Sequence, residues 1–141
     1  MVKEVLSGHT LNTNAAKIAR RLGELGIAVE WVTVVGDVRD HLHDAFHLAW
    51  NRARVIITTG GLGPTHDDIT RTVFCEVFNR MLVPDDSVLK NIEALFARRN
   101  RQVTPRNTDQ ARVPTGTEVM MNRWGTAPGI YLAEAGRHWF M

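Results

Sequence analysis

The chain has 141 residues, of which 44% are hydrophobic and 23% are charged. This length and this balance are typical of one ordinary globular domain with a core of its own. Lysine and arginine number 17 against 15 aspartates and glutamates, which leaves a net charge of +2. So small a charge gives no reason to expect a nucleic acid as partner.

The cysteine count and the apolar runs bear on the compartment. The single cysteine, Cys75, excludes an internal disulfide and fits a reducing cytosol. No apolar run approaches the roughly 18 residues of a membrane span, and the first residues lack the apolar core of a signal peptide. We therefore expect a cytoplasmic protein without a membrane partner.

The first half of the chain alternates helical and strand patterns. Ile18, Leu22 and Leu25 recur at helical spacing, with Asn12 or Thr13 as N-cap and Gly26 as C-terminal cap. Residues 29–35, VEWVTVV, predict a strand that ends at Gly36-Asp37, and a second helix follows from about Asp40. Residues 55–59 predict a short strand buried on both faces of a parallel sheet.

The second half predicts two more helices and then short strands. The first of these helices is defined by Ile69, Val73, Val77 and Phe78, and the second runs from about Ser87 to Arg99. Ala135-Gly136 has the pattern of a hairpin turn. This order predicts an α/β fold, a three-layer α/β/α sandwich with a mostly parallel sheet and a small C-terminal β-hairpin. We expect residues 1–141 to form one domain that is truncated at both ends, because only MVKEVL precedes the first turn and the chain stops at Trp139-Phe140-Met141 in mid-strand.

The turn TTGGLGPTHDD, residues 58–68, lies between a predicted strand and a predicted helix. Ligands of parallel α/β sheets bind beyond the carboxyl ends of the strands. Gly60, Gly61 and Gly63 permit positive φ angles and a close approach of backbone N–H groups to an anion, and phosphate is the natural ligand. The spacing matches neither a Rossmann fingerprint nor a P-loop, so a plain turn is the alternative.

Three aspartates give this turn a second possible role. Asp67 and Asp68 would repel a phosphate unless a divalent cation such as Mg²⁺ lay between them. Asp37 ends a predicted strand and would lie on the same rim of the sheet. The alternatives are structural: Thr65 and Asp68 have the spacing of a capping box, and Asp37 could cap the next helix. The sequence alone does not separate a ligand from a cap at these positions.

Several stretches together resemble a known family. They are KEVLSGHTLNTNAAKIARRL, VVGD, ARVIITTGGLGPTHDDITR, NRQVTPRNTDQARVPTG and NRWGTAPGIYL. They resemble the N-terminal domain of the competence- and damage-inducible protein CinA, within the molybdopterin-binding MogA/MoaB-like superfamily. The resemblance covers nearly the whole chain and implies a three-layer α/β/α fold. The chain departs from the family at its ends, where the first apolar strand is nearly absent and a Leu-Pro-Gly-Val-Pro loop is lacking.

The resemblance implies two related chemistries. In the CinA branch the domain is similar to a metal-dependent ADP-ribose pyrophosphatase, and in the molybdopterin branch Asp37 and Asp68 match aspartates that support adenylylation of molybdopterin. The implied catalytic residues are Asp37 and Asp68, and the implied metal ligands are Asp37, Asp67 and Asp68. The implied ligand-binding residues are Asn14, Thr59, Gly60, Gly61, Gly63, Gly125, Thr126, Pro128 and Gly129.

A basic cluster lies beyond these motifs. Arg98, Arg99, Arg101 and Arg106 surround the end of the fourth predicted helix, either as a solvated helix end or as a phosphate clamp. Asn107 and Gln110 match family positions that imply ribose or base contacts.

We expect a pyrophosphate-containing ligand, ADP-ribose-like or molybdopterin, that is hydrolysed with the help of Mg²⁺ or a similar ion. Molybdopterin binding or adenylylation is the alternative, and a non-catalytic binding or oligomerisation module is a second one. We also expect a homo-oligomer, a dimer or a trimer.

Overall fold

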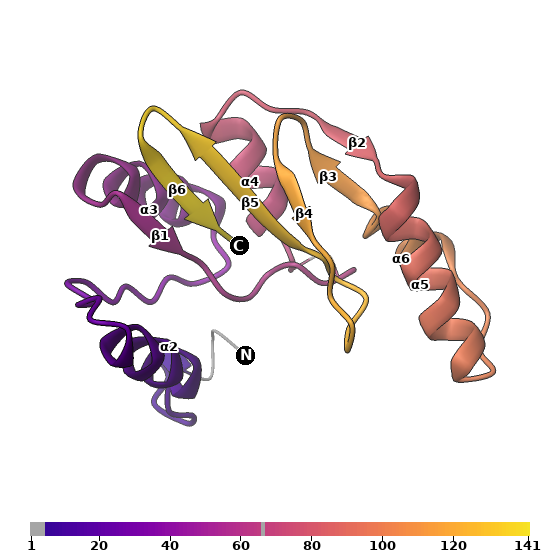
Figure 1. Ribbon diagram of the computed structural model, residues 1–141, viewed down its shortest axis with the longest axis horizontal. Helices are drawn as coiled ribbons and strands as arrows, with labels where there is room; N and C mark the ends of the chain where they lie inside the picture. Colours follow the sequence, from indigo (N-terminus) through magenta and orange to yellow (C-terminus); the bar gives the residue numbers. More distant parts are fainter. Residues whose placement is uncertain (1–4, 66) are drawn as a thin grey trace.

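The structure is a computed structural model that describes residues 5–65 and 67–141. Its helices are α2 (Thr13–Glu24), α3 (Arg39–Arg52), α4 (Thr70–Val77), α5 (Asp86–Arg98) and α6 (Pro105–Asp109). Its strands are β1 (Val55–Ile57), β2 (Leu82–Pro84), β3 (Arg112–Pro114), β4 (Glu118–Met120), β5 (Gly129–Glu134) and β6 (Arg137–Phe140) (Figure 1). Within the described residues, no helix combines the length and the apolar character needed to cross a bilayer.

The main sheet has the strand order β1-β6-β5-β4, and β2 pairs with β3 in a separate ribbon. β1 runs parallel to β6, with Ile56 opposite Trp139, whereas β5 runs antiparallel to both β6 and β4. The predicted α/β class is confirmed, including the C-terminal hairpin. The described sheet is mixed rather than mostly parallel, because only one of its three strand pairs is parallel.

The local signals for turns and caps are confirmed. Ala135 and Gly136, between β5 and β6, both have positive φ, at 50° and 72°, as a two-residue hairpin turn of the primed type requires. Asn12 caps α2, since its side-chain oxygen accepts the Ala15 N–H at 3.1 Å. Gly26, just beyond the helix, has a φ of 76°.

The predicted strand over residues 29–35 is wrong. These residues carry no strand pairing in the structure, and most of their side chains are exposed. Two contacts from Arg52 hold the segment: its guanidinium donates to Thr33 Oγ1 at 2.7 Å and lies over the ring of Trp31. β-Branched residues favour extended backbone, but a strand also needs a neighbouring edge to pair with, and the described part of the chain offers none to this segment.

The prediction for β1 is half right. A strand forms, but it spans only Val55–Ile57, and only Ile56 is buried. β1 is an edge strand of the sheet, so one of its sides has no strand pairing within the described residues. Val55 and Ile57 lie on an exposed face, and α2, which Figure 1 shows standing apart from the sheet, has no buried residue.

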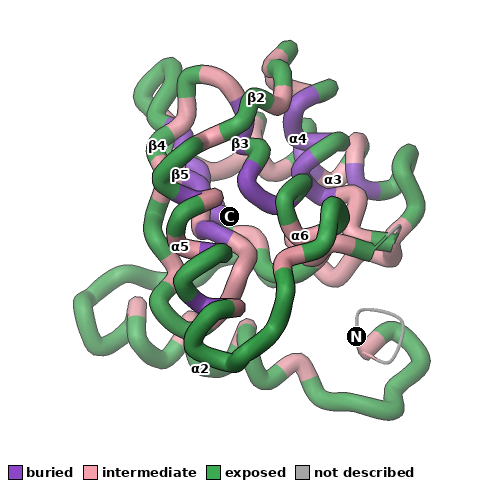
Figure 2. Tube along the Cα trace, turned by 90° about the vertical axis from the view of Figure 1, so that its right-hand side faces the viewer, coloured by how far each residue is buried: buried purple, intermediate pink, exposed green. Residues whose placement is uncertain are grey.

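The buried residues form two separate hydrophobic cores. The first joins α3, α4 and the main sheet through residues that include Phe46, Phe74 and Trp139. The second joins α5 and β3 through Val88, Ile92, Ala111 and Val113. Figure 2 shows the buried stretches of the trace within these elements, whereas α2 is exposed or half-buried throughout. The chain is therefore organised around two centres of packing.

Trp139 is the largest fully buried side chain. Its ring lies 4.9 Å from the ring of Phe46 and 5.3 Å from that of Phe78, centroid to centroid, and its indole N–H donates to Thr58 Oγ1 at 3.2 Å. Trp139 thus links α3, α4 and the residue that follows β1.

We predict that Trp139→Ala lowers the free energy of unfolding by about 3–5 kcal/mol, because it leaves a large cavity in the first core. Urea denaturation followed by far-UV circular dichroism measures the loss, and Trp139→Phe serves if the alanine variant does not fold. Trp124→Ala is the matched control, since Trp124 is 85% exposed. Equal losses in the two alanine variants would contradict the prediction.

Candidate functional site

The glycine turn joins β1 to α4 at the end of the sheet. Gly60 and Gly61 have φ angles of 99° and 67°, so the predicted positive φ is confirmed at both. A Cβ atom on Gly61 would lie 2.0 Å from the hydroxyl oxygen of Thr70, the first residue of α4. Glycine is therefore required here both for backbone conformation and for close approach to the helix.

The predicted positive φ is wrong for Gly63, which serves the turn instead by making room for the carboxylate of Asp68. A Cβ atom on Gly63 would lie 2.6 Å from Asp68 Oδ2. That oxygen accepts the backbone N–H of Thr65 at 2.9 Å and also the Thr65 hydroxyl. Asp68 is thereby fixed against the turn.

The surroundings of Asp68 favour its charged form. Burial acts to raise the pKa of this carboxyl, but hydrogen bonds from the Thr65 hydroxyl and from the backbone N–H groups of Thr65 and Gly63 lower it, as does the charge of Arg71. The lowering effects prevail, so the pKa of Asp68 lies below its usual value. The site therefore holds a fixed negative charge.

The capping alternatives are only partly realised. Asp68 does bond back to the N–H of Thr65, as in a capping box, but the N-cap of α4 is Ile69, which makes no side-chain cap bond. The N-cap of α3 is Val38, not Asp37. Asp68 therefore closes the turn rather than the helix, and Asp37 does not cap α3.

A hollow of about 400 Å³ opens beside the turn. One wall consists of Gly63, Pro64, Thr65 and Asp68 together with the first residues of α4. The opposite wall consists of Leu82 of β2 and of Arg106 and Asp109 of α6. The walls come from the two separate packing centres, and a junction of this kind is where small-molecule sites commonly form.

Arg71 crosses the junction beneath this hollow. It is 6% exposed and extends from α4 to the chain between α6 and β3. Its Nη1 donates to the carbonyl oxygens of Asp109, Gln110 and Arg112 at 3.3, 3.4 and 2.8 Å. Its Nη2 lies 3.9 Å from Asp109 Oδ2, and its buried Nε has no partner within the described residues. The guanidinium therefore attaches α6 and β3 to the helix that follows the turn.

The charges around the hollow nearly cancel. Asp68 and Asp109 contribute two carboxylates, and Arg71 and Arg106 contribute two guanidinium groups. The repulsion that the sequence predicts between the aspartates and a phosphate is thus partly offset by arginines from α4 and α6. An anion can approach this wall of the protein even before a cation is added.

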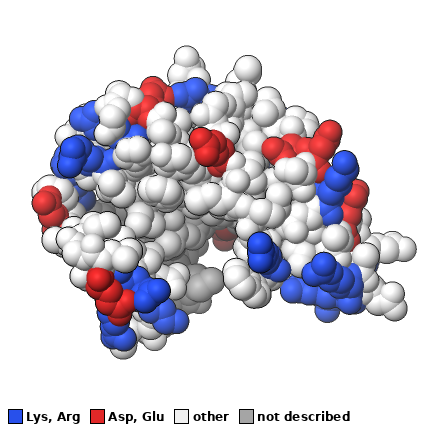
Figure 3. Space-filling model, in the orientation of Figure 1, with Lys and Arg blue, Asp and Glu red and all other residues white. Residues whose placement is uncertain are grey.

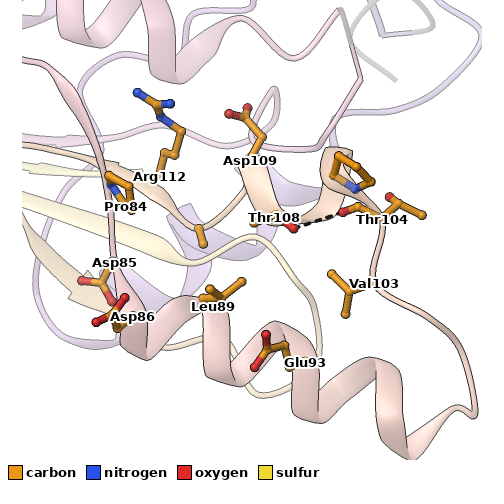
Figure 4. A pocket seen from close by; sticks show the side chains of 12 residues that line it. Pro84, Asp85, Asp86, Leu89, Glu93, Val103, Thr104, Thr108, Asp109 and Arg112 are labelled. Carbon is orange, nitrogen blue, oxygen red and sulfur yellow. Dashed lines mark hydrogen bonds between the residues drawn. The ribbon is translucent and has the colours of Figure 1, made fainter.

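A larger hollow, of about 620 Å³, lies on the other side of α6 (Figure 4). Asp85, Asp86 and Glu93 stand along α5 on one side of it, and Leu89 and Val103 supply apolar surface. Asp85 is already occupied as the N-cap of α5, because it accepts the N–H groups of Ser87 and Val88. An acidic rim disfavours phosphate, whereas the smaller hollow carries charges of both signs.

The other predicted binding residues do not line the smaller hollow. They are Asn14, Asp37, Thr59, Gly60, Gly61, Asp67, Gly125, Thr126, Pro128 and Gly129. Among them, Asn14 is exposed on α2, Asp67 is exposed beside the turn, and Pro128 is buried. Their roles in binding stay predictions.

The loop that contains Gly125 is built around Asn122. The Asn122 side-chain oxygen accepts the N–H groups of Trp124 and Gly125, both at 3.0 Å, and its Nδ2 donates to the carbonyl of Ala127 at 3.0 Å. Asn107 completes a capping box with Thr104. Gln110 is 1% exposed; its Nε2 donates to the Leu62 carbonyl at 3.5 Å, and its Oε1 has no hydrogen-bond partner within the described residues. Asn122 and Asn107 therefore stabilise the fold. The ligand contacts that the resemblance implies for Asn107 and Gln110 stay predictions.

The predicted metal ion has a limited set of ligands. In residues 5–65 and 67–141, no three His, Cys, Asp or Glu side chains come close enough to hold a metal ion together. Asp37, Asp67 and Asp68 therefore do not form a three-carboxylate cage. Mg²⁺ is commonly held by one or two carboxylates with substrate phosphates and water completing its shell. Of the three aspartates only Asp68 lines the hollow, and a metal at this site stays a prediction.

Sequence reasoning missed Arg71 and Asp109. Arg71 and Asp109 are 38 residues apart along the chain, and their contact depends on how α6 folds against α4. The sequence offered one signal for Arg71, its position directly after Asp67-Asp68-Ile69-Thr70 in the glycine motif. Arg106 was among four clustered arginines, and nothing in the pattern distinguished it from the others.

Comparisons with known proteins agree with this architecture. The model of a family described as a probable molybdopterin binding domain matches residues 3–141. A CinA-like protein of Dictyoglomus turgidum is 46% identical over 134 residues, covering 95% of this chain and 33% of that protein. A second CinA-like protein, of Dictyoglomus thermophilum, is also 46% identical with the same coverage.

The solved structures give the same result. The crystal structure of the protein CinA from Thermoplasma acidophilum, described there as of unknown function, superposes with a TM-score of 0.86 at 33% identity. The match covers 97% of this chain and 80% of that one. The chain spans about a third of the length of the two curated relatives. On these grounds the chain belongs to the family of CinA-like, molybdopterin-binding-type domains.

Proposed function

We propose that the hollow beside the glycine turn binds the phosphates of a pyrophosphate-containing nucleotide, such as ADP-ribose, and that the domain hydrolyses its P–O–P bridge. The observation that supports this proposal is the hollow itself, which has a glycine turn and the first residues of α4 on one wall and Arg106 on the other. Backbone N–H groups at a helix N-terminus and arginine side chains are the groups that proteins use for phosphate.

In the proposed reaction, water attacks one phosphorus atom, and the bond from that phosphorus to the bridging oxygen breaks. AMP and ribose 5-phosphate are the products from ADP-ribose. Asp68, which lines the hollow and is fixed by Thr65, accepts the proton of the attacking water. Asp68 and Asp67 would hold the divalent ion, which when bound polarises the phosphoryl oxygens. The exposed Arg106 side chain orients the phosphates toward the turn.

Binding of a pterin is the second candidate, and the match to the molybdopterin-binding family model favours it. Molybdopterin also carries a phosphate, so the same turn would hold it. The predicted homo-oligomer and the assignment to the cytoplasm stay predictions, and a non-catalytic module is the outcome if neither ligand binds.

For the hydrolase we predict that the chain releases AMP from ADP-ribose in the presence of Mg²⁺ and that Asp68→Asn slows this release about a hundredfold or more. Chromatographic assay of AMP measures the rate, with circular dichroism to verify that the variant folds. Asp86→Asn is the matched control, because Asp86 lies on the other hollow. A wild-type chain that is folded but neither binds nor cleaves ADP-ribose would sink the proposal.

For the ionisation of Asp68 we predict that Thr65→Val raises the pKa of this carboxyl, since the substitution removes a hydroxyl donor to Oδ2. A folded-state pKa below the usual value of 3.8 stabilises the protein above that pH, and this contribution is lost as pH falls through the folded-state pKa. A ¹³C NMR titration of the Asp68 carboxyl measures its pKa in the wild type and in Thr65→Val. Thr117→Val is the control, because the Thr117 hydroxyl donates to Pro114 instead. An unchanged pKa in Thr65→Val would contradict the assigned cause.

For the pterin candidate we predict that the purified chain, if it acts on molybdopterin, retains a fluorescent pterin after gel filtration and that Gly63→Ala releases it. The added methyl group would collide with the Asp68 carboxylate and deform the turn. Gly23→Ala is the control, since a Cβ atom at Gly23 meets nothing within 4 Å. Pterin retained equally by both variants would remove the glycine turn from the site.

A further inference from the structure

Four charged side chains alternate in sign along the exposed side of α5. They are Asp86, Lys90, Glu93 and Arg98. Each is exposed, and within the described residues none of the four side chains has a hydrogen bond or an ion pair. The opposite side of the helix is buried, because Val88 and Ile92 belong to the second core. These four charges are therefore available to a partner from outside the chain.

The helix dipole explains only part of this pattern. It favours an acidic residue in the first turn and a basic residue in the last, which accounts for Asp86 and Arg98. It does not account for Lys90, which stands ahead of Glu93 in the middle of the helix. Their side chains form no ion pair with each other in the described structure. The dipole therefore leaves the alternating order unexplained.

The order negative, positive, negative, positive is self-complementary. A second copy whose α5 runs antiparallel reverses the order, so that Asp86 of each copy meets Arg98 of the other, and Lys90 of each copy meets Glu93 of the other. Every contact then pairs unlike charges, whereas a parallel arrangement would place like charges opposite each other. A two-fold axis through the middle of α5 generates the antiparallel arrangement, and two-fold dimers are the commonest closed assemblies.

The surface between and beside these charges suits a second helix. Ala94 and Ala97 are exposed on the same side of α5, and side chains this small let two helices approach closely. The larger hollow beside α5 adds the half-buried apolar side chains of Leu89 and Val103 (Figure 4). Figure 3 shows acidic and basic side chains interspersed along the right-hand side of the molecule, where Figure 1 places this helix. The face thus offers apolar contacts as well as charges.

We propose that the exposed side of α5 is a homodimer surface, on which a second copy of this chain docks with its α5 antiparallel. None of the four charged residues lines the hollow beside the glycine turn, so this inference does not rest on the proposed function. Exposed ion pairs contribute little each and are screened by salt, so the dimer is weak and salt-sensitive. The general expectation of a homo-oligomer is thereby narrowed to one surface with two-fold symmetry.

Sedimentation-equilibrium centrifugation of the full chain measures the dissociation constant of the dimer. We expect wild type to pass from monomer to dimer as its concentration rises to about 1 mM in about 0.1 M salt. In about 1 M salt the dissociation constant should increase about tenfold or more, because the charges are screened. Wild type that stays monomeric over this whole range of concentration overturns the inference.

Two charge-reversal variants test the alternating order. Asp86→Lys with Glu93→Lys makes the face wholly positive, and Lys90→Glu with Arg98→Glu makes it wholly negative. Like charges then oppose each other across the two-fold axis, so each variant alone should dimerise at least about tenfold more weakly than wild type. An equimolar mixture of the two should restore the dimer, because every contact again pairs unlike charges. Restored association also shows that neither variant has lost its fold.

Lys17→Glu with Arg20→Glu is the matched control, since it makes the same change in net charge as Lys90→Glu with Arg98→Glu, at exposed residues of α2. It should leave the dissociation constant unchanged. A mixture that stays monomeric overturns the inference, and so does an equal loss in the control, which would indicate repulsion between net charges. A dimer that persists in both charge-reversal variants places the contact on another surface and overturns it as well.

Discussion

The buried guanidinium of Arg71 is the contact on which the candidate site depends. The chain has two hydrophobic cores, and α6 and the glycine turn lie on either side of the hollow between them. Arg71 joins the two sides by carrying three carbonyl bonds from the segment between α6 and β3 to the first turn of α4. A buried charge without these partners would be strongly destabilising, so the partners and the arginine hold one another in place. Together with the bond from Gln110 Nε2 to the Leu62 carbonyl, Arg71 links the two walls of the hollow.

The glycine turn depends on the same principle at shorter range. Gly61 lets the backbone approach Thr70, and Gly63 leaves space for the carboxylate of Asp68. The hydrogen bonds from Thr65 then fix this carboxylate and favour its charged form. The flexibility that glycine brings to an unfolded chain thus becomes a rigid turn in the folded one. Gly61 and Gly63 are thus each required by a different neighbouring residue of the turn, Thr70 and Asp68.

Local patterns in the sequence were sufficient for most of the fold. Helical periodicity and the caps at Asn12 and Gly26 located α2, and Ala135-Gly136 located the hairpin. The prediction of a strand at residues 29–35 was wrong, because β-branched residues only favour extended backbone, whereas a strand also requires a neighbouring edge to pair with. The family, and with it the class of fold, could be inferred from the glycine motif and its flanking stretches.

The site could be predicted only on its local side. The turn, its three glycines and Asp68 are adjacent in sequence, so their spacing carried the signal. The opposite wall comes from Leu82, Arg106 and Asp109, which reach the turn only through tertiary packing. Arg106 could not be told from Arg98, Arg99 and Arg101, since side-chain chemistry is identical and only position differs.

The free edge of β1 has a consequence for the behaviour of the protein in solution. Among residues 5–65 and 67–141, one edge of β1 has no strand pairing and Val55 and Ile57 are exposed, which makes this edge a template for further strands. It stands directly before the glycine turn, and the extended apolar residues 29–35 are exposed nearby in sequence. Natural sheets protect such edges with lysine, proline or a bulge, and β1 has none of these. Within the described residues, the edge of the sheet that lies beside the turn is therefore open to the addition of a further strand.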